Sequence, residues 1–258
     1  MFQKDIIPIS PGTQFAKPNH MAYLPRYAII WDGAVFHVTW QCHNHSWLLK
    51  YDWAKQLYYD LLLKYKDRYK VCFYSYHFMD NHIHLSGKIL GTKEEFSTLF
   101  KIVNSRLAKE INKQLKRKGQ VVMDRFKSPC IQSDRALLAV MTYQDLNSYR
   151  AKKVPHPKDY RWSSYHFYAY GKIDPLLTPA PPYLAMGNTD QERQQAYRKL
   201  VEEILQNEGF KKKDYSRRCY IGDPNWVIRR SKELKIIMQA KRQAYLLRRW
   251  RQFNASSP

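Results

Sequence analysis

Residues 71–90 read VCFYSYHFMDNHIHLSGKIL, and this stretch decides the fold of the chain. Residues 71–79 are rich in β-branched and aromatic side chains, and a second such run over 82–90 follows after only Asp80 and Asn81. A connection of two residues joins antiparallel strands, because a crossover between parallel strands needs a dozen residues or more. The stretch therefore predicts an antiparallel hairpin and disfavours a doubly wound parallel sheet.

Apolar residues on either side of the hairpin follow the periods of further strands and helices. The expected elements are a strand over 33–41, a helix over 51–65, the hairpin, a helix over 93–116, a strand pair over 121–132 and a helix over 134–152. This order predicts an α+β domain with one antiparallel sheet and helices packed against a face.

The two ends of the chain differ in composition from its middle. Residues 1–28 hold several prolines and glycines without a clear period, which predicts an irregular arm before a domain over 29–170. Prolines between 175 and 182 indicate a linker, and a mainly helical region then extends to residue 258. In its expected helix over 227–250, the possible core contacts are Ile228, Leu234, Ile237 and Met238.

The charge of the chain favours a polyanionic partner. The 44 Lys and Arg against 22 Asp and Glu give a net charge of +22. Such an excess suits nucleic acid or an anionic membrane surface, and the 15% aromatic content favours single-stranded nucleic acid, on whose bases rings can stack. The alternative is a solvated basic surface around an aromatic core.

Residues 211–258 alone carry 14 Lys and Arg against three acids, which is half of the net charge. This segment predicts either a clamp on DNA or a structural helix with solvated charges, and the clamp is favoured. The candidate contacts to nucleic acid in the whole chain are Arg125, Lys127, Arg150, Lys211, Lys212, Lys213, Arg217 and Arg218.

The four cysteines lie far apart and form no CxxC pair, which is typical of reduced thiols. The sequence has neither an apolar signal segment at its start nor an apolar run long enough to span a bilayer, so we expect a cytoplasmic, nucleoid-associated protein. Cys42, His43, His45 and the nearby His37 could form a zinc site, although their spacing fits no standard finger.

His82 and His84 are the strongest local sign of chemistry. Side chains alternate along a strand, so both imidazoles project to one face, where they can bind one divalent ion. Tyr143 and Asn147 are four residues apart on an expected helix and share a face. Asn147 could offer its carbonyl oxygen to the ion, and Tyr143 could direct its hydroxyl at a bound phosphate. The alternative is two chance histidines, a buried tyrosine and a surface asparagine.

Several motifs together resemble one known family. They are Phe36-His37-Val38-Thr39, Met79-Asp80-Asn81-His82-Ile83-His84-Leu85, Asp124-Arg125-Phe126-Lys127-Ser128, Tyr143-Gln144-Asp145-Leu146-Asn147, Arg150-Ala151 and Arg161-Trp162-Ser163-Ser164-Tyr165. In order and spacing these motifs are similar to those of the REP-associated tyrosine transposases, members of the HUH single-strand endonucleases and relatives of insertion-sequence transposases. The resemblance covers residues 20–170 and continues more loosely to 197.

The resemblance implies a ferredoxin-like or RRM-like fold and a nicking reaction on single-stranded or hairpin DNA of the REP type. It implies Mg²⁺ or Mn²⁺ held by His82, His84 and Asn147, with Tyr143 as the nucleophile. The products would be a 5′-phosphotyrosine and a free 3′-hydroxyl, which can be rejoined during DNA transposition and recombination. It leaves open whether the protein is a monomer or a homodimer.

This chain departs from the family pattern at three places. Asp80 replaces a proline before the Asn-His pair, and its carboxylate could join the metal site or cap a turn. Ser148 replaces a proline after Asn147, and residues 43–45 replace an Asn-Arg pair. These changes keep two other functions open, a catalytically silent binder of structured single strands and an RNA-binding protein.

Overall fold

The computed structural model describes residues 28–208, 215 and 218–255. Its centre is a five-stranded sheet in the order β2-β3-β1-β4-β5. The bounds are β1 Val35–Gln41, β2 Val71–Phe78, β3 His82–Ile89, β4 Cys130–Ile131 and β5 Tyr220–Ile221. The first four strands pair antiparallel in the order of a ferredoxin-like fold, and β5 joins β4 in parallel. The predicted hairpin and the α+β class are confirmed. The expected arm over 1–28 lies outside the described residues, except for Ala28.

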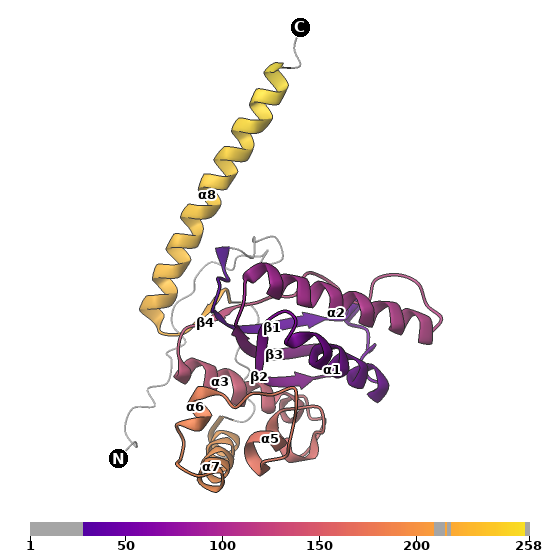
Figure 1. Ribbon diagram of the computed structural model, residues 1–258, viewed down its shortest axis with the longest axis vertical. Helices are drawn as coiled ribbons and strands as arrows, with labels where there is room; N and C mark the ends of the chain where they lie inside the picture. The colour runs from indigo at the N-terminus through magenta and orange to yellow at the C-terminus, as the bar shows by residue number, and fades with distance from the viewer. Residues whose placement is uncertain (1–27, 209–214, 216–217, 256–258) are drawn as a thin grey trace.

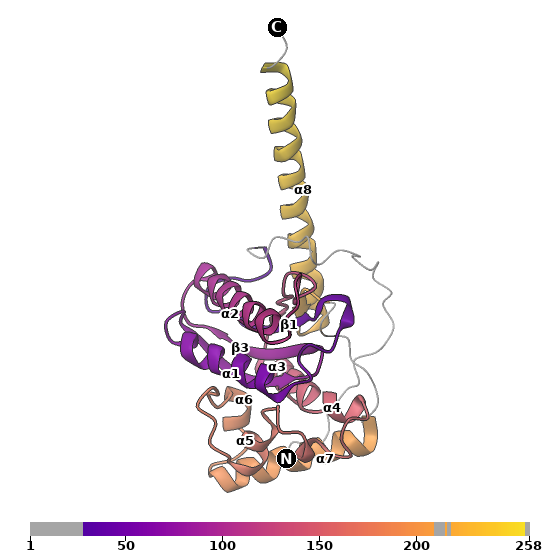
Figure 2. The ribbon, with the colours of Figure 1, turned by 90° about the vertical axis from the view of Figure 1, so that its right-hand side faces the viewer.

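Helices cover both faces of the sheet (Figures 1 and 2). One face carries α1 (Asp52–Lys66) and α2 (Lys93–Gln114), and α2 begins with a capping box between Thr92 and Glu95. The other face carries α3 and the helices that follow it. Their bounds are α3 Asp134–Asp145, α4 Asn147–Arg150, α5 Tyr165–Tyr170, α6 Pro181–Leu184 and α7 Asp190–Glu208, with short 3₁₀ helices at His43–His45 and Pro157–Asp159.

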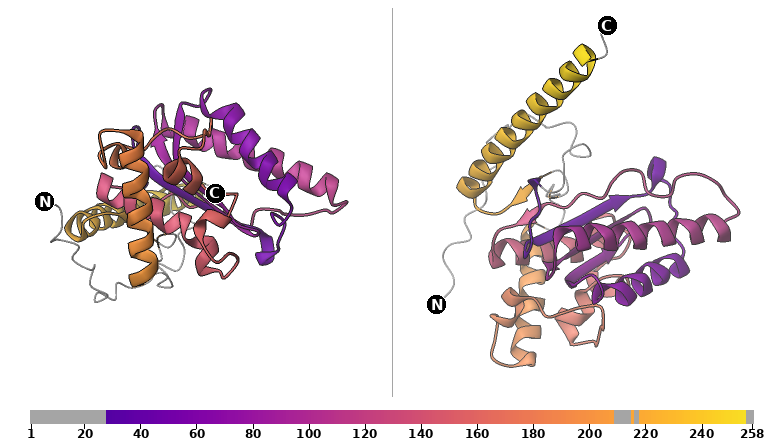
Figure 3. Two further views of the ribbon diagram at one scale, coloured as in Figure 1. Left: turned by 90° about the horizontal axis from the view of Figure 1, so that it is seen from below. Right: turned by 45° about the horizontal axis from the view of Figure 1, so that its top comes forward.

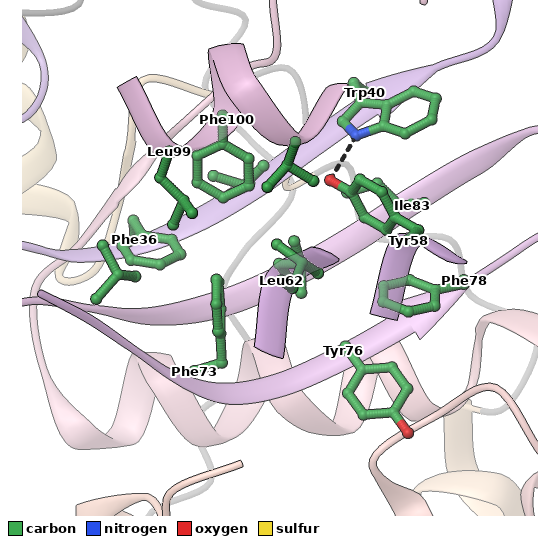
Figure 4. Packing of buried hydrophobic residues seen from close by; sticks show 14 of the residues in the cluster. Phe36, Trp40, Tyr58, Leu62, Phe73, Tyr76, Phe78, Ile83, Leu99 and Phe100 are labelled. Atoms are coloured by element: carbon green, nitrogen blue, oxygen red, sulfur yellow. Dashed lines mark hydrogen bonds between the residues drawn. The ribbon is translucent and has the colours of Figure 1, made fainter. Parts of the chain in front are cut away.

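The face under α1 and α2 is an aromatic core (Figure 4). Phe36, Val38 and Trp40 alternate along β1 and are buried there, and the indole of Trp40 donates a 2.9 Å hydrogen bond to the hydroxyl of Tyr58. The ring of Phe36 lies against that of Phe96 on α2, with ring centroids 4.8 Å apart. Burial of these apolar side chains fixes which face of the sheet packs against α1 and α2.

A β-bulge changes which residues of β2 face this core. Phe73 pairs with Gly87 and Ser75 pairs with Ser86, so Tyr74 is the extra residue. Before the bulge the odd-numbered residues face α1 and α2, and after it Tyr76 and Phe78 do. The polar residues that alternate with Tyr76 and Phe78 are therefore turned to the opposite face.

The segment over 121–132 does not form the expected strand pair. It runs beside β1 instead, with bridges from Val122 to Cys42 and from Lys127 to Thr39 before β4. Thr39 and Lys127 exchange both backbone hydrogen bonds, at 3.1 and 2.8 Å. Because β1 satisfies these backbone groups, the segment needs no partner strand of its own.

The proline-containing stretch after residue 170 packs on the body. Leu176 and Ala180 are buried, and Leu177 bridges to Phe73 of β2. A second core forms between α3, α5, α6 and α7, and it is rich in tyrosine. The buried rings include Tyr165, Tyr168, Tyr183 and Tyr197. Instead of a free linker, this region is the cover over the second face of the sheet.

The last helix, α8 (Pro224–Ala255), leads away from the body as one straight arm (Figures 1 and 3). Leu234 is buried at its inner part and Met238 packs against the core, as expected. Ile228 and Ile237 are exposed, so the expected core contacts of these two residues are wrong. Within the described part of the chain, no helix combines the length and the apolar character that a membrane crossing requires.

We expect Gly87→Ala to lower the free energy of unfolding by about 2 kcal/mol, because the core would be overpacked at the bulge. A Cβ atom on Gly87 would lie 2.1 Å from the carbonyl oxygen of Cys72 and 2.8 Å from Cζ of Phe36. Urea unfolding measures the loss. Lys88→Ala, one residue further on and exposed, is the control and should change stability by less than about 0.5 kcal/mol.

Candidate active site

A row of polar side chains crosses the sheet face that α3 covers. His77 of β2 pairs with His84 of β3, and His84 pairs with Thr39 of β1. The row continues at both ends, because His77 bridges to Ser163 and Thr39 bridges to Lys127. Paired residues of antiparallel strands project to the same face, so five polar side chains lie along one line. The two imidazoles are at its centre.

A second polar row lies beside the first. Ser75, Ser86 and His37 are paired across β2, β3 and β1. The hydroxyl of Ser75 donates a 2.6 Å hydrogen bond to Oε1 of Gln144 on α3, and it also contacts the hydroxyl of Ser86. These contacts fix the distance between α3 and the polar face of the sheet.

The carboxylate of Asp145 anchors the end of α3. It is buried and accepts hydrogen bonds from the hydroxyls of Ser164, at 3.0 Å, and Tyr197, at 2.7 Å. Burial raises the pKa of Asp145 to about 7, although both hydrogen bonds oppose this rise. α3 is thereby tied to α5 and α7 as well as to the sheet.

Neighbouring side chains orient the two predicted metal-binding imidazoles. Nδ1 of His82 lies 2.7 Å from Oδ1 of Asn81, which can only accept, so Nε2 of His82 carries the lone pair. Nδ1 of His84 lies 3.0 Å from Nε2 of His37. Burial lowers the pKa of His37 to about 3, so its ring is neutral at neutral pH. If His84 donates this hydrogen bond, its Nε2 also carries a lone pair, as an ion requires.

The structure brings Tyr143 to the imidazoles. The ring centroids of His82 and His84 are 5.1 Å apart, and the ring of Tyr143 lies edge-on to His84 at 5.9 Å. Tyr143 is only 6% exposed. Its ring is enclosed by that of Tyr215, at 5.0 Å, and by the guanidinium of Arg150, also at 5.0 Å.

The single helix expected over 134–152 is interrupted at Leu146, whose ψ of −1° separates α3 from α4. Arg150 reaches back across this break and donates a 2.9 Å hydrogen bond to the carbonyl of Tyr143. Asn147 begins α4, and its Nδ2 is buried without a hydrogen-bond partner in the described part of the chain. A buried amide nitrogen without a partner is an unmet polar group that a bound ligand could satisfy.

Two imidazoles alone do not complete the coordination of a cation. Over residues 28–208, 215 and 218–255, no group of three or more His, Cys, Asp or Glu side chains could hold a metal ion. A cation beside His82 and His84 would therefore take its other ligands from groups that are not His, Cys, Asp or Glu, such as phosphate and water oxygens.

Asp80 and the Cys/His cluster take structural positions. The carboxylate of Asp80 is held by two ammonium groups, that of Lys55 at 2.8 Å and that of Lys153. It therefore neither joins the imidazoles nor caps a turn. The thiol of Cys42 is buried in the aromatic core, and burial raises its pKa to about 11. Within the described residues the expected zinc cluster with His37, His43 and His45 does not form.

The candidate DNA contacts are dispersed. Lys127 is half-buried at the end of the polar row, and two strand spacings place it about 10 Å from His84. Arg125 and Arg218 are exposed, whereas Arg150 contacts Tyr143 as described above. The predicted contacts at 211–213 and 217 lie outside the described residues.

Sequence reasoning missed the roles of His37 and His77. The alternation of β1 already placed His37 on the face opposite Phe36, so its contact with His84 could have been considered. His77 is fully buried and stacks on Tyr160 at 4.8 Å. Neither of its ring nitrogens has a hydrogen-bond partner among the described residues. Strict alternation along β2 would have placed His77 with Phe73 on the face of the aromatic core. The position of His77 beside His84 could therefore not be predicted without knowledge of the bulge.

Comparison with known proteins found no matching family model and no matching curated protein. A similar solved structure is that of a REP-associated tyrosine transposase bound to a REP hairpin, with 17% sequence identity and a TM-score of 0.45. The match covers 57% of this chain and 86% of the other. At these values we draw no functional conclusion from the match.

We expect Asp80→Ala to lower the free energy of unfolding by about 3 kcal/mol, because Lys55, only 3% exposed, would keep an uncompensated charge. Asp80→Ala combined with Lys55→Met removes both charges and should recover most of the loss. Urea unfolding of the two variants tests this. Equal losses in both would contradict it.

The same group should make stability depend on pH at the acid end. Burial alone would raise the pKa of Asp80, but the hydrogen bonds from Lys153 and Lys55 outweigh it and hold the pKa below its usual value. The stabilisation is therefore present above pH ~4 and is lost as the pH falls through the lowered pKa. Unfolding curves of wild type and Asp80→Ala should converge in acid.

Proposed function

We propose that this chain is a metal-dependent endonuclease of the transposase type, which nicks single-stranded DNA through Tyr143. One observation carries the proposal. His82, His84 and Tyr143 come from two separate elements and meet on the polar face of the sheet, with ring separations of 5.1 and 5.9 Å. The motifs that resemble the REP-associated tyrosine transposases assign the same three residues to cleavage.

The reaction would transfer a phosphoryl group from DNA to the phenol. The oxygen of Tyr143 attacks the phosphorus, the bond from phosphorus to the 3′-oxygen breaks, and the phenolic proton is replaced by the phosphorus. The 3′-oxygen leaves and takes up a proton, which gives a 5′-phosphotyrosine and a free 3′-hydroxyl. The phosphodiester bond is conserved in the adduct, so reversal with another 3′-hydroxyl rejoins strands.

His82, His84 and Asn147 would hold Mn²⁺ or Mg²⁺. Nitrogen donors favour Mn²⁺ over Mg²⁺, because Mg²⁺ prefers oxygen ligands. The bound ion would polarise the scissile phosphate and stabilise its developing charge. His37 fixes the ring of His84 and Asn81 fixes that of His82, and Lys127 at the end of the polar row would contact a neighbouring phosphate.

The enclosure of Tyr143 favours a second candidate, a binder of structured single strands that does not cut. Tyr215 and Arg150 cover the ring in this structure. Tyr143 is only 6% exposed, so a strand reaches it only if neighbouring side chains move. If they do not move, the basic side of α8 would still bind DNA.

Incubation with a labelled DNA hairpin that has single-stranded flanks, in Mn²⁺ or Mg²⁺, should give a covalent adduct on a denaturing gel. Tyr143→Phe should lower its yield by on the order of a thousandfold or more while binding persists. Tyr149→Phe, in the adjacent short helix, is the matched control and should still form the adduct. His82→Ala should lose metal-dependent cleavage.

Three results would decide against nicking by Tyr143. Binding without an adduct in wild type would support the silent binder. An adduct that survives Tyr143→Phe would require another nucleophile. Stronger binding to an RNA hairpin of the same sequence would indicate an RNA-binding protein.

The basic side of α8 should contribute to DNA affinity through phosphate contacts. We expect neutralisation of Lys241, Arg242, Arg248 and Arg249 to glutamine to lower affinity and to reduce the slope of log K against log salt by up to about 3 units. The matched control neutralises four exposed lysines on or next to α2, which are Lys101, Lys109, Lys113 and Lys116. Titration of hairpin DNA at several salt concentrations measures both slopes, and equal slopes would contradict the clamp.

A further inference from the structure

The outer segment of α8, residues 235–250, exposes a large apolar surface. From Gln239 to Trp250 every side chain is exposed. More than half of the surface of Ile236, Leu246, Leu247 and Trp250 is accessible to solvent. Apolar side chains gathered on one projecting helix mark an interaction surface, whereas scattered ones do not.

These side chains follow the spacing of a helix–helix seam. Ile236, Ala240, Gln243, Leu247 and Trp250 succeed one another at intervals of four, three, four and three residues. This interval keeps them on one side of a helix and is typical of coiled coils. Ile237, Ala244 and Leu246 flank the seam on its two sides.

The cations of the outer segment avoid this side. Lys235, Arg242 and Arg249 are seven residues apart and form one line, and Lys241 and Arg248 form the next line. At 3.6 residues per turn, both lines fall on the side opposite the seam. Within residues 235–250 the positive charge therefore does not oppose contact between two apolar sides.

We propose that the apolar side of the outer segment pairs with the same side of a second copy of this chain, which makes the protein a homodimer. Phosphates do not suit this side, because it carries no cation. Acyl chains do not suit it either, because Gln239 and Gln243 would be buried without partners. Between two copies, the Gln243 amides can bond to each other, as polar seam residues do in coiled coils.

Homodimerisation goes beyond the proposed function and does not depend on catalysis. The basic sides of the paired helices point outward, where both can contact DNA. The pairing needs neither metal nor DNA, so Tyr143→Phe should dimerise like wild type.

Sedimentation equilibrium of nuclease-treated protein in moderate salt should give twice the chain mass of 31.0 kDa. Leu247→Glu should weaken the dimer at least about 100-fold, because it places two carboxylates in an apolar seam. Tyr245→Glu is the matched control. Tyr245 is 59% exposed and Leu247 57%, but Tyr245 lies on the basic side, so its variant should remain a dimer. Circular dichroism confirms that α8 persists in both.

A wild-type protein that sediments as a monomer at micromolar concentrations would overturn the proposal, and so would equal weakening by the two variants. Flotation with vesicles containing anionic lipid tests the alternative that the apolar side of α8 binds a membrane. A monomer that binds these vesicles and loses this binding in Leu247→Glu would assign the apolar side to membranes and would also overturn the proposal.

Discussion

The two faces of the central sheet have opposite chemistry, and the bulge at Tyr74 keeps them apart. β1 and β3 separate apolar from polar residues by simple alternation, but β2 does so only because one extra residue changes its phase. In a regular strand of the same sequence without the bulge, Ser75 would face the aromatic core, away from Ser86 and Gln144, and an unpaired hydroxyl is costly there. Gly87 accommodates the bulge, since its missing side chain leaves room for the Cys72 carbonyl. The polar rows therefore depend on a local irregularity in an apolar hairpin.

A polar sheet face can exist in the interior only if its cover is also polar. α3 meets this requirement on one side through Gln144, which accepts from Ser75, and Asp145 holds the far side through Ser164 and Tyr197. Tyr143 precedes these two residues in the sequence, so the contacts that fix α3 also fix the height of its ring above His84. The geometry of the candidate site is thus a result of how the helix is anchored, and distant tyrosines in α5 and α7 contribute to it.

The elements with a regular period of apolar residues could be predicted from the sequence. The elements that depend on a local irregularity could not. The hairpin, β1, α1 and α2 follow their patterns. His82 and His84 share a face as their spacing indicates, and the ring of Tyr143 lies beside His84, a neighbour that spacing alone did not predict. No proline or glycine marks the break in the helix at Leu146. The segment over 121–132 pairs with β1 through backbone groups, which leave no signal in the sequence. The pairing of His77 with His84 could not be predicted, because it depends on the bulge. The prolines after 174 suggested a linker, because sequence alone does not show that Leu176 and Ala180 are buried.

Asp80, Lys55 and Lys153 join three parts of the chain that are distant in sequence, and this has an evolutionary consequence. Loss of Asp80 leaves the buried ammonium of Lys55 without a counter-charge, whereas loss of Lys153 still leaves Asp80 and Lys55 as a balanced pair. Substitutions at positions 80 and 55 are therefore not independent. A chain with proline at position 80 offers nothing to an ammonium group at position 55 and should have an uncharged residue there. Positions 55 and 80 should therefore covary among homologues, whereas position 153 can vary more freely.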